Sequence, residues 1–162
     1  MQETFDEFVY LASRPGLHPK YLFPMVEAGA KAIIIEGYHS GTLHACSEEE
    51  YPGCQYNLVP FLEMARERQV PVFLTFGPFI GKHENIGYEP FDEGKPGYET
   101  SSRMVKAGIV PLRANWRQME EVCQKMKAVL DHVDDYQSVI AEMYAAFPFK
   151  APLEKIQAAA SE

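Results

Sequence analysis

The chain has 162 residues, of which 46% are apolar and 23% charged, and its formal net charge is −8. Such a length and composition suit one globular domain with a proper hydrophobic core. The negative charge argues against nucleic acid and anionic membrane as partners, because both require a basic face, and no apolar run approaches the ~20 residues of a membrane span.

Short apolar runs and helical stretches alternate along the first part of the chain. FVYLA, residues 8–12, predicts a strand. Pro19 suits the first turn of a helix that stops at Gly29, with a kink or a late start caused by Pro24. AIII, residues 32–35, is a continuous apolar run and predicts a strand that is covered on both faces.

A long polar loop over 38–56 leads into the next helix, which we expect over 57–68 from its apolar spacing. VPVFLTF, residues 70–76, predicts a third buried strand. The stretch 77–97 is rich in glycine, proline and charge. It is too long for a mere connection, so we expect a functional or mobile loop there.

The last third of the chain continues the alternation. A short helix is expected over 98–107 and a fourth strand at GIVPL, residues 108–112. Asn115 can cap the next helix, with Gln118 in the capping-box position. A further helix is predicted over 134–147, and the tail beyond it is helical or frayed.

Strands that alternate with helices indicate βαβ units and a parallel sheet between helix layers. We therefore predict an α/β protein with a three-layer α/β/α architecture and a small, four-stranded parallel sheet, Rossmann-like in form. Residues 1–133 make the α/β domain, and residues 134–162 are a helical extension of the same domain.

Ligands of open parallel sheets gather at the carboxyl ends of the strands. GYHSGT follows the second predicted strand and TFGPF ends the third, so the two segments should lie close together. Gly37 and Gly41 permit close backbone approach. Donors and acceptors come from Tyr38, His39, Ser40 and Thr42. The plainer alternative is a glycine turn that closes a βα unit.

Other kinds of site are less well supported. The phosphate-binding patterns GxGxxG and GxxxxGK are absent, and Ser40 lacks the spacing of a nucleophile elbow. Four residues of one loop are of types that bind zinc, namely His39, His44, Cys46 and Cys54. Their spacing matches no structural zinc pattern, so we predict neither a metal nor a cofactor.

Cysteine usage and the N-terminal residues bear on location. The three cysteines are too few, and odd in number, for a disulfide framework. MQETFDEFVY has no basic start and no apolar stretch of signal length. We expect a cytoplasmic protein, or else a leader that this sequence lacks.

Several strings recur in an order that resembles one family. PGLHP is followed by AGAKAIIIEGYHSGTL, then by ARERQVPVFLTF and YETSSRMVKAGIVPL. Over about residues 8–130 this resembles the C-terminal domain of the bacterial-type L-asparaginases and glutaminase-asparaginases, and of the related amidotransferase subunit that acts on glutamyl-tRNA.

The resemblance implies a domain without its own nucleophile. In that family the catalytic threonines lie in a larger N-terminal domain marked by TGGTI and a TDT-like motif, and neither string occurs here. The C-terminal domain lends side chains to a neighbouring subunit's active site and supplies oligomer contacts. The implied partners are therefore an N-terminal asparaginase-type catalytic domain, further copies in a homo-oligomer, and a small amino-acid amide as ligand.

The family's site residues carry over only in part. The loop glycines fall on Gly37 and Gly41, with His39 where a glycine is usual, and the substrate-orienting asparagine falls on Thr42. A glutamate that meets the substrate's amino group falls near Ser101, with Glu99 as its rival. These departures imply altered substrate handling. The alternative function is a non-catalytic domain that binds an amino acid or mediates oligomerisation.

Overall fold

The computed structural model describes residues 8–13, 17–47, 49–78 and 87–162. Its centre is a four-stranded sheet in the order β1-β2-β3-β4, with every neighbouring pair parallel. The strands are β1 (Phe8–Ala12), β2 (Ala32–Gly37), β3 (Val72–Phe76) and β4 (Val110–Asn115). The predicted small parallel sheet is confirmed.

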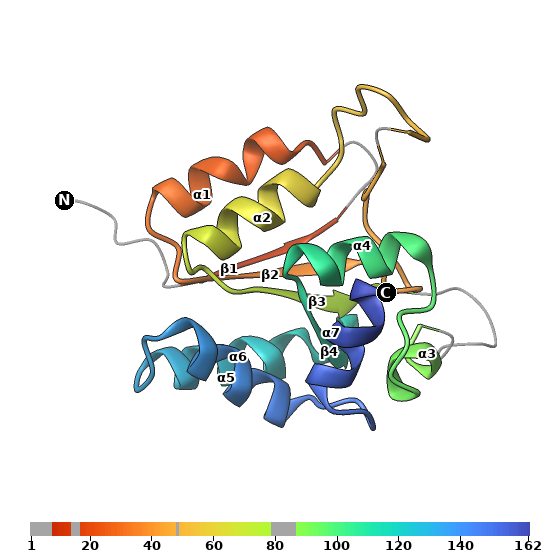
Figure 1. Ribbon diagram of the computed structural model, residues 1–162. Coiled ribbons are helices and arrows are strands. Elements are labelled where there is room, and N and C mark those ends of the chain that lie inside the picture. Colours follow the sequence, from red (N-terminus) through yellow and green to blue (C-terminus); the bar gives the residue numbers. More distant parts are fainter. Residues whose placement is uncertain (1–7, 14–16, 48, 79–86) are drawn as a thin grey trace.

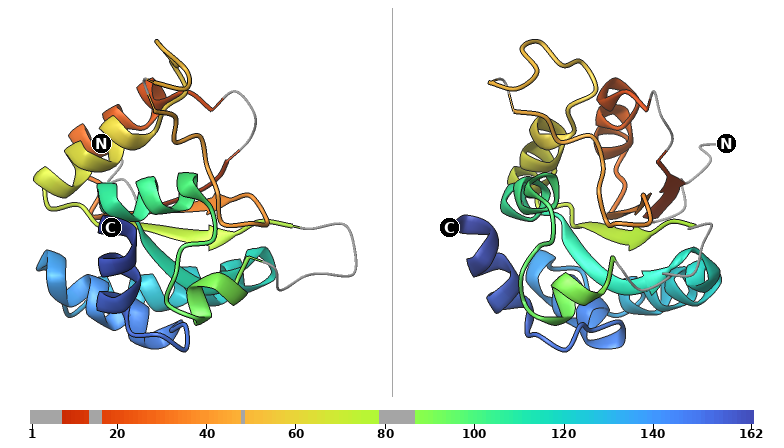
Figure 2. Two further views of the ribbon diagram at one scale, coloured as in Figure 1. Left: turned by 45° about the vertical axis from the view of Figure 1, so that its right-hand side comes forward. Right: turned by 90° about the vertical axis from the view of Figure 1, so that its right-hand side faces the viewer.

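Helices cover both faces of this sheet (Figures 1 and 2). One layer holds α1 (Phe23–Glu27), α2 (Val59–Glu67) and α4 (Glu99–Ala107). The other holds α5 (Met119–Leu130) and α6 (Tyr136–Ala146). α7 (Leu153–Ser161) packs against α4 at the β4 side, so the chain's end joins the two layers. The predicted three-layer α/β/α fold is confirmed.

The two central strands are buried along their whole length. This is why both were readable as unbroken apolar runs, since a strand covered on both faces has no solvent side to carry polar residues. β1 is only partly buried at every position, because it is an edge strand. Its apolar sequence is therefore unusual for its place.

The two edges of the sheet differ in their free backbone groups. On β4, Pro111 has no N–H, and the Arg113 N–H donates to the Phe147 carbonyl at 2.9 Å. On β1, the Ser13 N–H donates inward to the Glu36 carbonyl at 2.8 Å. Successive N–H groups of a strand point to opposite edges. Since that of Ser13 points inward, those of Tyr10 and Ala12 point outward. No described residue accepts a hydrogen bond from either.

Local signals set the helix ends. The helix predicted from Pro19 forms a 3₁₀ turn (Pro19–Tyr21), and the α-helix starts late at Phe23, next to Pro24. A second 3₁₀ turn (Trp116–Gln118) precedes α5, and Asn115 and Gln118 form the predicted capping box. Gly108 ends α4 with a left-handed φ of 116°.

The stretch predicted as a long loop over 77–97 needs a correction. Its second half contains α3 (Glu89–Asp92), and Phe91 there is 1% exposed. The Phe91 ring lies 5.9 Å from that of Phe76 and 5.3 Å from that of Phe149. This half of the segment therefore belongs to the core, while residues 79–86 lie outside the described residues.

Within the described ranges, no helix combines the length and the apolarity needed to cross a bilayer.

Candidate ligand site at the carboxyl edge of the sheet

The loop after β2 packs closely against the end of β3. Its backbone turns through two hydrogen bonds of 2.9 Å, from the Tyr38 N–H to the Thr42 carbonyl and from the Gly41 N–H to the Tyr38 carbonyl. A Cβ on Gly41 would lie 2.5 Å from the Phe76 ring, and one on Gly77 would lie 2.3 Å from the Gly37 carbonyl oxygen. The predicted proximity of the two strand ends is confirmed, and it requires glycine.

Two hydroxyls of this loop form a pair. Ser40 Oγ lies 3.0 Å from Thr42 Oγ1, and both side chains are partly exposed. Each hydroxyl can donate one hydrogen bond and accept others, so the pair keeps capacity for a polar ligand.

The other predicted loop residues lie beside this pair. Tyr38 OH is 3.3 Å from His44 Nε2, and the two rings meet edge to face. His39 is exposed. Tyr38 is thus partly engaged by His44, while His39 lies on the surface of the same loop.

The first turns of α4 reach the same loop. Ser101 is fully buried, and its hydroxyl donates to the Gly41 carbonyl at 3.3 Å. Ser101 therefore anchors the loop. Glu99 is exposed, and its carboxylate lies 2.5 Å from the Arg103 guanidinium. The structure therefore brings Ser101 to the loop, whereas Glu99 lies on the surface of α4 beside Arg103.

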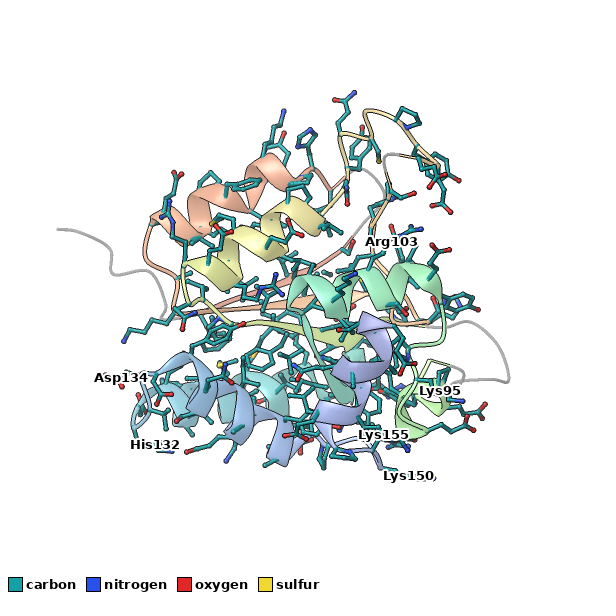
Figure 3. All side chains as sticks on the ribbon, in the orientation of Figure 1. Lys95, Arg103, His132, Asp134, Lys150 and Lys155 are labelled. Atoms are coloured by element: carbon teal, nitrogen blue, oxygen red, sulfur yellow. The ribbon has the colours of Figure 1, made fainter. Side chains whose placement is uncertain are left out.

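Arg103 organises this part of the surface, although the sequence did not single it out (Figure 3). Besides Glu99, its guanidinium donates to the Ala45 carbonyl at 3.1 Å and pairs with Glu50 at 3.1 Å. The hydrogen bond from Arg103, helped by one from the Ser47 hydroxyl, lowers the pKa of the Glu50 carboxyl below its ordinary value. Arg103 thus ties the loop after β2 to α4.

A shallow hollow of about 530 Å³ lies beside Arg103. Its lining residues are Glu50, Tyr51, Tyr98, Glu99, Thr100 and Arg103. Both tyrosines are among the most exposed aromatic side chains of the described residues, at 64% for Tyr51 and 53% for Tyr98. The hollow therefore combines charges of both signs with aromatic surface.

A larger hollow of about 630 Å³ lies between α4, α6 and α7. It is bordered by Arg66 at the end of α2 and by Val110 at the start of β4, so it opens at the opposite edge of the sheet. It contains none of the predicted site residues.

Three strands contribute to a buried polar cluster that we did not predict from the sequence. Tyr10 OH donates to Glu36 Oε2 at 2.9 Å and lies 3.3 Å from Thr75 Oγ1. Glu36 is 9% exposed and Thr75 is fully buried. Burial, above all, raises the pKa of the Tyr10 phenol beyond its ordinary range, so the phenol stays neutral and can donate to the carboxylate.

One signal could have located this cluster. Glu36 is the only charged residue in the apolar run of β2, and it stands at the strand's carboxyl end. An apolar strand with one carboxylate calls for a buried partner, since an unpaired buried charge is costly. The partners themselves depend on strand register, which pairs Glu36 with Ala12 and with Thr75.

The residues considered for zinc do not gather around one point. Among the described residues, no group of three or more His, Cys, Asp or Glu side chains is placed to hold a metal ion. The His44 ring faces Tyr38 and Tyr56. Cys46 and Cys54 are in contact with each other, with 2.7 Å between their sulfur atoms.

Comparison with known proteins leaves the family open. A scan against protein-family models gave no match, and a search of curated proteins gave none either. The likeness to the asparaginase C-terminal domain therefore stays a prediction, carried by the order of its motifs.

Proposed function

We propose that this chain is the smaller, C-terminal domain of an L-asparaginase-like amidohydrolase of the cytoplasm. It lends substrate-orienting groups to an active site whose threonine nucleophile lies on an N-terminal catalytic domain. In such a reaction the threonine attacks the side-chain amide of the substrate, ammonia leaves, and water resolves the acyl-enzyme. The hydrolytic chemistry would therefore come from outside this chain.

One observation carries the proposal more than any other. The paired hydroxyls of Ser40 and Thr42 lie in a glycine-shaped loop at the carboxyl edge of a parallel sheet, where ligands of this architecture bind. Thr42 occupies the place of the family's substrate-orienting asparagine. The hydroxyl pair suits hydrogen bonding to an amide group, and Tyr38 and His39 border it on the same loop.

The proposed homo-oligomer also has a candidate surface. β1 presents outward N–H groups and a row of partly buried apolar side chains. Natural edge strands are usually shielded by charge, proline or covering segments, as β4 is by Pro111 and by residues near Phe147. We assign the assembly contacts of this domain to the β1 edge.

Ligand-induced thermal stabilisation tests the proposal. The chain is titrated with asparagine, glutamine and aspartate, and a saturable rise in Tm is expected with at least one amide. The double change Ser40→Ala and Thr42→Val should abolish the rise, whereas Ser161→Ala, at the end of α7, should leave it intact. A flat response to all three compounds would contradict binding at this site.

Activity provides the second test. The isolated chain should release no ammonia from these amides, and activity should appear only with a partner domain that carries the TGGTI and TDT-like motifs. Ammonia release by this polypeptide alone, abolished by changing one of its own residues, would overturn the proposal.

A second candidate function rests on the hollow beside Arg103. The Arg103 guanidinium suits the carboxylate of a free amino acid, and the Glu50 and Glu99 carboxylates suit its ammonium group. Two exposed tyrosines lie beside these charges. In this case the domain would be a non-catalytic binding module. Arg103→Gln separates the two candidates. It should remove amino-acid binding at the hollow, whereas the Ser40 and Thr42 changes should remove binding at the loop.

A further inference from the structure

Two of the three cysteines meet in the loop between β2 and α2. Cys46 and Cys54 are both partly exposed and unbonded, and their sulfur atoms lie 2.7 Å apart. Cys123 lies on α5, in the helix layer on the other face of the sheet. The fold thus brings two thiols into contact and keeps the third apart. Cys123 can therefore serve as an internal control for the reactivity of the pair.

The backbone around the pair is held in this arrangement by its own contacts. The Tyr51 N–H donates to the Ser47 carbonyl, and the Cys54 N–H donates to the Tyr51 carbonyl, so two turns return the chain to Cys46. Arg103 holds the segment from outside, through the Ala45 carbonyl and the Glu50 carboxylate. The proximity of the thiols is therefore built into the folded loop.

We propose that Cys46 and Cys54 form a reversible redox site, which becomes an intramolecular disulfide by exchange with a small-molecule disulfide such as oxidised glutathione. The thiolate of one cysteine attacks a sulfur of the small disulfide, forms a mixed disulfide and expels one thiolate. The second cysteine then attacks the protein sulfur of that mixed disulfide and expels the other. Two protein thiols lose two electrons and two protons, and one small disulfide becomes two small thiols.

The surroundings of the pair affect the rate of exchange. Burial, together with the contact to Cys54, raises the pKa of the Cys46 thiol to about 11. Because the thiolate is the nucleophile, this slows attack by Cys46 near neutral pH. Either cysteine can attack first, and the other then resolves the mixed disulfide. Glu50 and Tyr51 lie within the ring that the new bond closes, so the hollow beside Arg103 would be fixed by it.

The test uses the whole chain in buffers with graded ratios of oxidised to reduced glutathione. Samples are quenched in acid, the remaining thiols are alkylated under denaturing conditions, and intact mass is measured. The wild type should lose two alkylatable thiols together, keep one, and regain both with dithiothreitol. Cleavage after Glu48 to Glu50, which lie between the two cysteines, should then yield two fragments joined by a disulfide.

Single substitutions identify the roles. Cys123→Ser should behave as the wild type. Cys46→Ser should stop at a glutathione adduct on Cys54, and Cys54→Ser should stop at one on Cys46. Three alkylated thiols in the wild type at every ratio, stable glutathione adducts on it, or disulfides between chains would each overturn the proposal.

Discussion

Gly41 is the residue on which the geometry of the candidate loop depends most. Its φ is +72°, and a Cβ would lie 2.5 Å from the Phe76 ring. Gly53 has nearly the same φ, +71°, but a Cβ there would meet nothing within 4 Å. The two glycines therefore separate the cost of backbone conformation from the cost of crowding.

We expect Gly53→Ala to lower the free energy of unfolding by about 1–2 kcal/mol, which is the backbone cost alone. Gly41→Ala should add roughly 1–3 kcal/mol of overpacking to that cost and should weaken ligand binding at Ser40 and Thr42. Urea unfolding of both variants measures the difference. Equal losses would mean that Phe76 moves aside without cost.

The Tyr10 hydroxyl is the second residue-scale test. Tyr10→Phe removes the donor to Glu36 Oε2, which leaves a nearly buried carboxylate oxygen without that partner. We expect a loss of about 1–3 kcal/mol in the free energy of unfolding. Tyr21 is 59% exposed, so Tyr21→Phe should change stability by less than about 0.5 kcal/mol. Similar values for the two variants would show that the cluster contributes little.

At the scale of elements, the sheet and most helices were predictable from the sequence. β1 was predicted with the bounds that it has, because five apolar residues are followed by Pro15 and Gly16. α3 was not predicted, because glycine and proline surround it. Its burial depends on a contact between Phe91 and Phe149, which come from distant parts of the chain.

The position of the candidate loop was predictable from the sequence, whereas several side chains near it were not. Glycines after an apolar strand located the loop, and Ser40 with Thr42 followed from it. The buried polar cluster draws its side chains from three strands, namely Tyr10, Glu36 and Thr75. They come into contact only through the register of those strands. Arg103 pairs with Glu99 at the local spacing i,i+4. Its other acceptors, Ala45 and Glu50, lie on a segment that no local pattern connects to α4.

The junction of α5 and α6 carries a pH-dependent contact. His132, in the turn after α5 (Figure 3), has Nδ1 at 2.6 Å from the Ala128 carbonyl and Nε2 at 2.8 Å from Glu142 on α6. Only the protonated ring donates from both nitrogens. The bond to Glu142, and then that to Ala128, raises the pKa of His132 above its ordinary 6.5.

Because the folded pKa is raised, this contact stabilises the protein fully below the unfolded value and is lost as pH rises through the folded one. As pH rises above the ordinary histidine value of 6.5, we expect the free energy of unfolding to fall by more in the wild type than in Glu142→Gln. An NMR titration of the His132 ring should give a pKa that drops in the variant. An unchanged ring pKa would contradict the contact.

For the whole molecule, the difference between the two sheet edges leads to a prediction about assembly. A second copy that pairs through its own β1 would satisfy the outward N–H groups of Tyr10 and Ala12 by a twofold contact, which is the commonest symmetry of homo-oligomers. Ala12→Pro removes one of these donors while the inward bond of Ser13 stays. The substitution gives β1 a proline, which has no N–H to offer a second copy, as Pro111 has none on β4.

Light scattering coupled to gel filtration measures the outcome. The wild type should show a concentration-dependent dimer, and Ala12→Pro should shift it to monomer with its circular dichroism unchanged, because a proline whose N–H would face outward is tolerated on an edge strand. Ala12→Ser keeps the N–H and should remain dimeric. A wild type that is monomeric at every concentration, or a proline variant that still dimerises, would place the assembly contacts on another surface and leave the apolar β1 edge to a different domain.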